Sequence, residues 1–262
     1  MLRNSRLLIG CLLLGGCASQ QAISPQQKAP ADFPETIYTE AVSGSTYRVD
    51  SGASQILITV RRGGLMASLG HDHIVASQNL QGFILIDEDS SQQRSCRADF
   101  YAPIANLEVD NAELRTQAGL LSTPSTNDIA GTKGNMLKSV EALDFPFAQL
   151  HSSDCHKALQ GEQSEVVLTI HGVDQRREIA INVDEISEDK IILSGKFSVL
   201  QSDFGIQPFS IMNGLIKVED KLELEVKIVA LNPKSTNPRS TRESSYYPSL
   251  NKTAAHQAPH YP

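Results

Sequence analysis

Short runs of apolar residues, separated by turn-forming residues, recur along most of this chain. The runs are rich in Val, Ile, Leu and Phe, and Gly, Asp, Asn or Ser lies between them, which is typical of strands in an antiparallel sandwich or barrel. In residues 222–228, apolar and charged side chains alternate strictly, so one face of that strand is dry and the other wet. The predicted strands cover residues 46–49, 56–60, 80–86, 96–101, 147–152, 165–170, 178–183, 191–200, 214–218 and 222–231.

The apolar period changes in the middle of the chain. Met136, Leu137, Val140 and Leu143 follow the spacing of one helical face, and residues 112–121 form a weaker helical candidate. The sequence therefore predicts a mainly antiparallel β domain with one or two short helices inserted between its strand groups.

Two of the predicted strands, residues 83–86 and 166–170, are apolar on both faces. A closed barrel of about eight strands has an interior that side chains can fill or that can hold one small ligand. Strands with two dry faces suit a barrel whose inner wall lines an apolar cavity and whose outer wall packs on helices. A plain filled core is the alternative, and periodicity does not separate the two.

The first 16 residues have the organisation of a signal peptide. Arg3 and Arg6 precede an apolar stretch, residues 7–14, that is too short to cross a bilayer as a helix. Leu-Gly-Gly then leads to Cys17, which resembles the lipobox of bacterial lipoproteins. This resemblance implies cleavage before Cys17 and acylation of its thiol, and two or three acyl chains hold a protein durably at a membrane. An ordinary secretory signal with an incidental cysteine is the alternative.

The residue after Cys17 is alanine rather than aspartate, which favours sorting to the periplasmic face of the outer membrane. Residues 17–44 are rich in Gln, Ala and Pro without apolar periodicity, so we expect a flexible tether there. Residues 232–262 are rich in Pro, Ser and Thr and predict a disordered tail. One folded domain, residues 45–231, remains between them.

Composition and charge narrow the class of protein. The chain has 262 residues, 40% of them hydrophobic, and a formal net charge of −7. The apolar content excludes a mostly disordered chain. The acidic balance argues against a nucleic-acid partner, because such binding needs a basic surface.

Cys96 and Cys155 are the thiols of the predicted domain. In an oxidising periplasm an even pair predicts a disulfide, and two unpaired thiols are the alternative. Both cysteines flank the predicted helical insertion, so the bond would close a long loop.

A pair of histidines is the main candidate in the sequence for a metal-binding or acid–base site. His71 and His73 are two residues apart, so on an extended strand both imidazoles point to one face and can begin a zinc or copper site. His151, His156 or His171 would have to complete it. The spacing matches no established metal motif, so hydrogen-bonded loop histidines are the alternative, and a general acid–base pair is a third reading.

Five stretches of the chain resemble the YceI-like family of periplasmic proteins. They are residues 47–50 with Ser54 before strand 56–60, residues 136–139 leading to 145–146, residues 167–173, residues 202–206 and residues 222–231. The resemblance implies an extended, lipocalin-like barrel with a helical insertion and an elongated channel for long polyisoprenoid lipids. The chain departs from the family's usual pattern at residues 70–73, Gly-His-Asp-His.

The resemblance provides no catalytic residues, so we expect a binding protein rather than an enzyme. The expected ligand is an isoprenoid-type lipid or a quinone, and a metal-binding or redox-accessory protein using His71 and His73 is the alternative. The candidate lining residues are apolar side chains of the predicted strands and loops. They are Ile58, Phe83, Leu85, Phe100, Leu168, Ile170, Phe197, Phe204 and Phe209.

Overall fold

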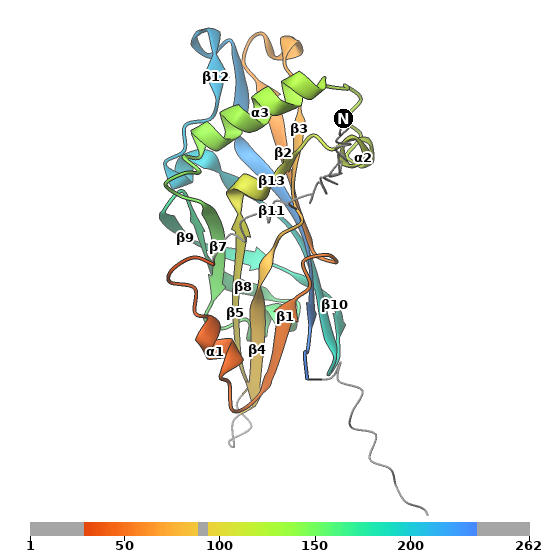
Figure 1. The fold of residues 1–262 in the computed structure, drawn as a ribbon, viewed down its shortest axis with the longest axis vertical. Helices are drawn as coiled ribbons and strands as arrows, with labels where there is room; N and C mark the ends of the chain where they lie inside the picture. The colour runs from red at the N-terminus through yellow and green to blue at the C-terminus, as the bar shows by residue number, and fades with distance from the viewer. Residues whose placement is uncertain (1–28, 89–93, 235–262) are drawn as a thin grey trace, which may run out of the picture.

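Thirteen strands form one antiparallel, strongly curled sheet in the computed structural model, which describes residues 29–88 and 94–234 (Figure 1). The mainly antiparallel β fold predicted from the sequence is confirmed. The strands are β1 (Ser45–Val49), β2 (Gln55–Gly63), β3 (His73–Ser77), β4 (Gln81–Glu88), β5 (Arg94–Pro103), β6 (Glu108–Val109), β7 (Phe147–Ser152), β8 (Gln163–Ile170), β9 (Val173–Ala180), β10 (Asn182–Ile186), β11 (Lys190–Leu200), β12 (Ser210–Ile211) and β13 (Ile216–Leu231).

The strand count differs from the expected eight because three long strands are interrupted. β1 and β2 follow one another along the same edge of β13. On their other side, β4 pairs with β1 and β3 pairs with β2. β9 and β10 are separated by Ile181 alone. With each of these pairs taken as one strand, and the two-residue β6 and β12 left out, eight strands remain. β9 pairs with β8, β10 pairs with β11, and the hydrogen-bond ladder is broken between β9 and β10 at Ile181, so the sheet curls round without closing in one continuous ladder.

Three predicted strands have wrong boundaries. Residues 178–183 span the break between β9 and β10. Residues 216–218 of the predicted strand 214–218, together with all of residues 222–231, belong to the single strand β13, whose register against β2 shifts between Val218 and Leu222. The polar run between those two residues reads as a turn in the sequence, but it forms an irregularity within a continuous strand.

Four α-helices accompany the sheet within residues 29–88 and 94–234. They are α1 (Glu35–Thr39), α2 (Ala112–Gln117), α3 (Thr126–Ser139) and α4 (His156–Leu159). Helix α3 lies across one end of the sheet, over β2 and β3 and beside the β12 hairpin (Figure 1). It begins with a capping box between Ser125 and Asp128, a device that satisfies free N–H groups at a helix start. None of these four helices is long and apolar enough to cross a bilayer.

The predicted helical stripe covers only the end of α3. The helix stops at Ser139, Glu141 has a positive φ of 46°, and Leu143 is 98% exposed. Leu143 therefore does not belong to the apolar face. The beginning of α3 was missed because it carries almost no apolar residues.

The prediction of a flexible tether is wrong for residues 29–44. Tyr38 on α1 is 2% exposed and stacks on Phe83 of β4 with ring centroids 5.1 Å apart. Phe33 and Tyr101 form a T-shaped pair with ring centroids 4.7 Å apart. Two aromatic side chains thus fasten this segment to the outer face of the sheet, without any apolar period for a sequence reading to detect. The expected signal peptide, Cys17 and residues 235–262 of the expected tail lie outside the described residues.

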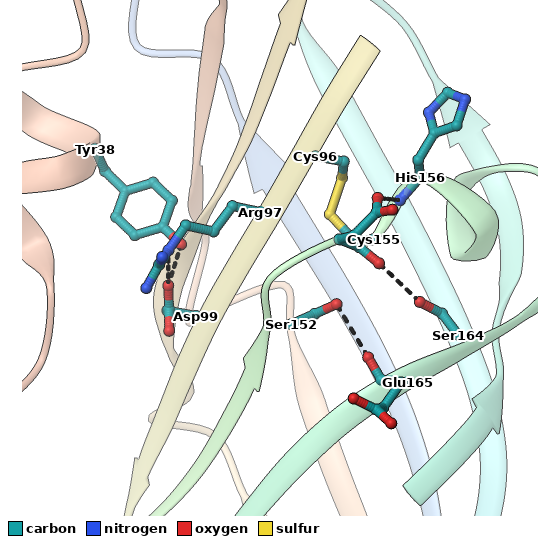
Figure 2. The surroundings of a disulfide bond; sticks show 10 residues. Tyr38, Cys96, Arg97, Asp99, Ser152, Cys155, His156, Ser164 and Glu165 are labelled. Carbon is teal, nitrogen blue, oxygen red and sulfur yellow. Dashed lines mark hydrogen bonds and ion pairs between the residues drawn. A yellow bond between two sulfur atoms is a disulfide. The ribbon is translucent and has the colours of Figure 1, made fainter. Parts of the chain in front are cut away.

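The predicted disulfide between Cys96 and Cys155 is confirmed (Figure 2). It joins β5 to the residue before α4 across 59 positions of sequence. Both cysteines are buried, and the Cys155 N–H also donates to the Cys96 carbonyl at 2.9 Å.

Replacing both cysteines, in Cys96→Ser/Cys155→Ser, should lower the free energy of unfolding by roughly 4 kcal/mol, because the unfolded chain regains the entropy of a long loop. For a domain of this size that corresponds to a melting temperature lower by about 8–16 °C. Thermal unfolding followed by circular dichroism measures the change. Wild-type protein kept reduced should match the variant, and equal melting temperatures for oxidised wild type and variant would contradict the prediction.

Candidate functional site

The interior of the curled sheet holds two adjoining apolar cavities. One, of about 140 Å³, lies among β5, β7, β8, β9, β11 and β13 and is called here the core cavity. The other, of about 220 Å³, lies between α3 and the walls formed by β2, β3 and β13 and is called the α3 cavity. Ala148 of β7 and Ile170 of β8 line both, so the two cavities meet at these residues.

The core cavity is walled almost entirely by aliphatic and aromatic side chains. The hydroxyl groups of its two serines already donate hydrogen bonds within the protein. Ser152 Oγ donates to the Glu165 carbonyl at 3.3 Å, and Ser164 Oγ donates to the Asp154 carbonyl at 3.0 Å (Figure 2). An apolar cavity of about 150 Å³ in a protein stays dry and takes up benzene. The core cavity therefore suits a hydrocarbon group.

The α3 cavity has a mostly apolar wall on the sheet side, where His73 and Gln201 are the polar residues, and a mixed wall on the α3 side. Its sheet side includes Ile58, Val75 and Leu222, whereas α3 contributes Thr132, Asn135, Met136 and Ser139. No residue of α3 is buried, because the inward face of this helix overlies the cavity instead of a packed core. The arrangement offers both hydrocarbon surface and hydrogen-bonding groups.

Six of the nine lining candidates from the sequence lie on these cavities. Phe100, Leu168 and Phe197 line the core cavity, Ile58 and Phe209 line the α3 cavity, and Ile170 lines both. All except Phe209, which directly precedes β12, come from strands whose inner faces form the walls. Their contact with a ligand remains a prediction.

Three candidates lie elsewhere. Phe83 is on the outer face of β4, between Tyr38 and the guanidinium of Arg48, and Leu85 shares that face because it is two positions along the strand. Phe204 is 1% exposed and packed within the main core, without lining either cavity. The sequence could not tell which face of β4 turns inward, since the strand is apolar on both.

The histidine pair is divided by the start of β3. His73 is the first residue of that strand and lines the α3 cavity, whereas His71 precedes it. The two rings are 6.5 Å apart and nearly perpendicular. Among residues 29–88 and 94–234 no three His, Cys, Asp or Glu side chains are placed to hold one metal ion, so the geometry gives the metal alternative no support.

His73 belongs instead to a buried polar network. Its Nδ1 is 2.6 Å from Asp110 Oδ2, and the other carboxylate oxygen of Asp110 accepts from the Ile74 N–H and from Arg115. The side chains of Asp110 and Arg115 are 0% and 4% exposed. Arg115 also donates to the backbone carbonyls of Asp72 and Ser122, so one ion pair ties β3 to α2 and the loop that leads to α3.

This network sets the charge state of Asp110. Burial by itself raises the pKa of a carboxyl group, but here the bonds from His73, the Ile74 N–H and Arg115 outweigh it, and the pKa of Asp110 lies below its ordinary value. Sequence reasoning identified neither Asp110 nor Arg115, because each is a lone charged residue beside a turn until the fold brings them to His73.

A second polar network lies on the outer face. Asp99 accepts from Tyr38 and Arg97 and contacts His151 Nδ1 at 2.7 Å (Figure 2 shows the first two). Burial and the neighbouring carboxylate raise the pKa of the Tyr38 hydroxyl. The network fastens α1 to β5 and touches neither cavity.

Protonating Asp110 should destabilise the protein in acid. Because the folded-state pKa is depressed, the contribution of Asp110 is present above its unfolded value near 3.8 and is lost as pH falls below it. Asp110→Asn should therefore cost about 3–5 kcal/mol at pH 7, where it leaves Arg115 buried and unpaired, and less at pH 3. Denaturant unfolding at both pH values measures this, and an equal loss at both would contradict the prediction.

A curled antiparallel β sheet around apolar cavities defines a lipocalin-like, cavity-bearing class of protein. The model of the YceI-like domain matches residues 47–230. The chain therefore belongs to the YceI-like domain family, as its sequence motifs predict.

Several solved structures are similar to this chain at low identity. A polyisoprenoid binding domain from Saccharophagus degradans is 12% identical over 71% of this chain and 98% of its own, with a TM-score of 0.49. BcnA of Burkholderia cenocepacia is 14% identical over 69% and 98%, with a TM-score of 0.46. The Campylobacter jejuni YCEI protein is 15% identical over 60% and 84%, with a TM-score of 0.38. No curated protein matches the chain.

Proposed function

We propose that this protein is a non-enzymatic carrier that binds one apolar, isoprenoid-type lipid inside its curled sheet. The observation that carries the proposal is the pair of apolar cavities that meet at Ala148 and Ile170. Membership of the YceI-like family supports it, because the sequence resemblance to that family implies an elongated channel for long polyisoprenoids.

The energetics favour such a ligand. Each methylene removed from water contributes about 0.8 kcal/mol, so ten buried carbons supply roughly 8 kcal/mol before ordering costs. A micromolar dissociation constant needs about that much, and a longer chain offsets the cost of ordering the lipid. Branched isoprenoid tails also suit walls built from Leu, Ile, Val and Phe.

We further propose that the protein acts in the bacterial envelope, anchored through acylated Cys17 to the periplasmic face of the outer membrane. The lipobox-like sequence supports this placement. A carrier fixed beside a bilayer would exchange its lipid with that bilayer over a short distance.

A lipid should accompany the protein when it is purified from envelope extracts under native conditions. Native mass spectrometry followed by solvent extraction identifies it, and we expect one apolar lipid per chain. Ala148→Phe places a ring where the two cavities meet, so it should weaken binding of a C40 isoprenoid at least tenfold, since burial of several carbons is lost.

The matched control for that variant is Ala118→Phe, which makes the same change at an exposed position beside α2. It should bind the C40 lipid as tightly as wild type does. Protein that carries no lipid and shows no saturable binding of the C40 isoprenoid would refute the carrier function.

Cys17→Ser should release the exported protein from the membrane fraction, because no thiol remains to accept the acyl chains. Fractionation together with incorporation of a labelled fatty acid measures the anchoring. Cys11→Ser, which changes a cysteine within the expected signal peptide, is the control and should stay in the membrane fraction. Unchanged labelling of Cys17→Ser would exclude this anchor.

A further inference from the structure

His73 is a polar side chain on the wall of the α3 cavity. It starts β3, where Val75 two positions along lines the same cavity, whereas Ile74 and Ala76 pack on the other side against Leu114 of α2. The alternation of a strand therefore turns the His73 ring to the cavity side of the sheet. Its side chain is only 15% exposed.

The hydrogen bond to Asp110 fixes the role of each ring nitrogen. An ionised carboxylate only accepts hydrogen bonds, so Nδ1 of His73 must carry the proton that it shares with Asp110 at 2.6 Å. Arg115 already balances the charge of Asp110, so a neutral imidazole leaves the buried network without excess charge. A neutral ring protonated at Nδ1 presents Nε2 as a bare acceptor.

Nε2 of His73 has no partner among the described residues, since the hydrogen bond of this ring is the one made by Nδ1. The other polar side chain on the sheet side, Gln201, already donates to the Glu219 carbonyl at 2.9 Å. An acceptor held rigidly in a mostly apolar cavity matches a ligand that carries one hydroxyl donor.

We propose that His73 recognises the hydroxyl head group of an isoprenoid alcohol or phenol, whose tail runs past Ala148 and Ile170 into the core cavity. This inference rests on the proposed lipid binding and specifies the ligand class and its orientation. An oxidised quinone or an aldehyde offers only acceptor oxygens, so it gains nothing from Nε2. The hydrophobic tail supplies the affinity, and His73 supplies the selection among head groups.

The test compares three C15 probes with one tail: farnesol, its methyl ether and farnesal. Isothermal titration should show wild-type protein binding farnesol about tenfold more tightly than the ether or the aldehyde, the effect of one hydrogen bond in a sheltered site. His73→Asn keeps an N–H donor near the position of Nδ1, able to bond Asp110, but removes Nε2. It should bind all three probes equally, at the affinity of wild type for the ether.

His151→Asn is the matched control. His151 also contacts a carboxylate through Nδ1, that of Asp99 at 2.7 Å, but it lines neither cavity. It should keep the tenfold preference. His73→Phe, which preserves the ring shape, repeats the test if His73→Asn fails to fold, and circular dichroism checks each variant.

The outcomes separate the two proposals. Equal wild-type affinity for farnesol and its ether overturns the head-group inference and leaves the carrier function standing. A preference that survives in both folded His73 variants also overturns it. Tighter binding of farnesal than of farnesol overturns the assignment of Nε2 as an acceptor. No binding of any probe or of the C40 lipid refutes the carrier function itself.

Discussion

The structure depends on hydrogen bonding along both edges of β13. One edge carries β11 from Lys190 to Leu200, and the other carries β2 and then β1. The interruption between β1 and β2 is bridged by buried Ser54, whose Oγ accepts from the Val229 N–H at 2.9 Å and lies 3.2 Å from the Val229 carbonyl. Since Val226 and Ile228 of β13 line the core cavity, a gap at this edge would open that cavity to water.

The fold class could be predicted because strand alternation and turn residues are local properties of a sequence. The positions of most strands followed from the same signal, including residues 147–152, which match β7. The breaks in long strands could not be predicted, because a strand that changes partner keeps its apolar pattern. The prediction of a flexible tether is wrong for residues 29–44 for a related reason. Phe33 and Tyr38 each contact the sheet as a single aromatic side chain. Single contacts of this kind produce no repeating apolar pattern in the sequence.

The lining of the cavities was only partly predictable. Leu168 and Ile170 lie on β8, where the partner strands leave one face as the inner wall, and both line cavities. On β4 the sequence offers two equivalent apolar faces, and the choice between Phe83 and Ile84 is made by α1 packing on one of them. The role of Asp110 beside His73 depends on three segments meeting in space, which no spacing along the chain encodes.

Because its interior is not filled by side chains, the sheet must be held in shape by interactions other than core packing. An empty cavity in a protein core costs about 24 cal/mol of stability per Å³. The α3 cavity of about 220 Å³ therefore lowers the stability of the empty protein by on the order of 5 kcal/mol. Backbone ladders, the disulfide and the buried Asp110–Arg115 pair hold the surrounding elements in place without drawing on that packing. A hydrocarbon guest would recover the lost contacts, so the same feature that costs the empty protein stability provides affinity for an apolar ligand.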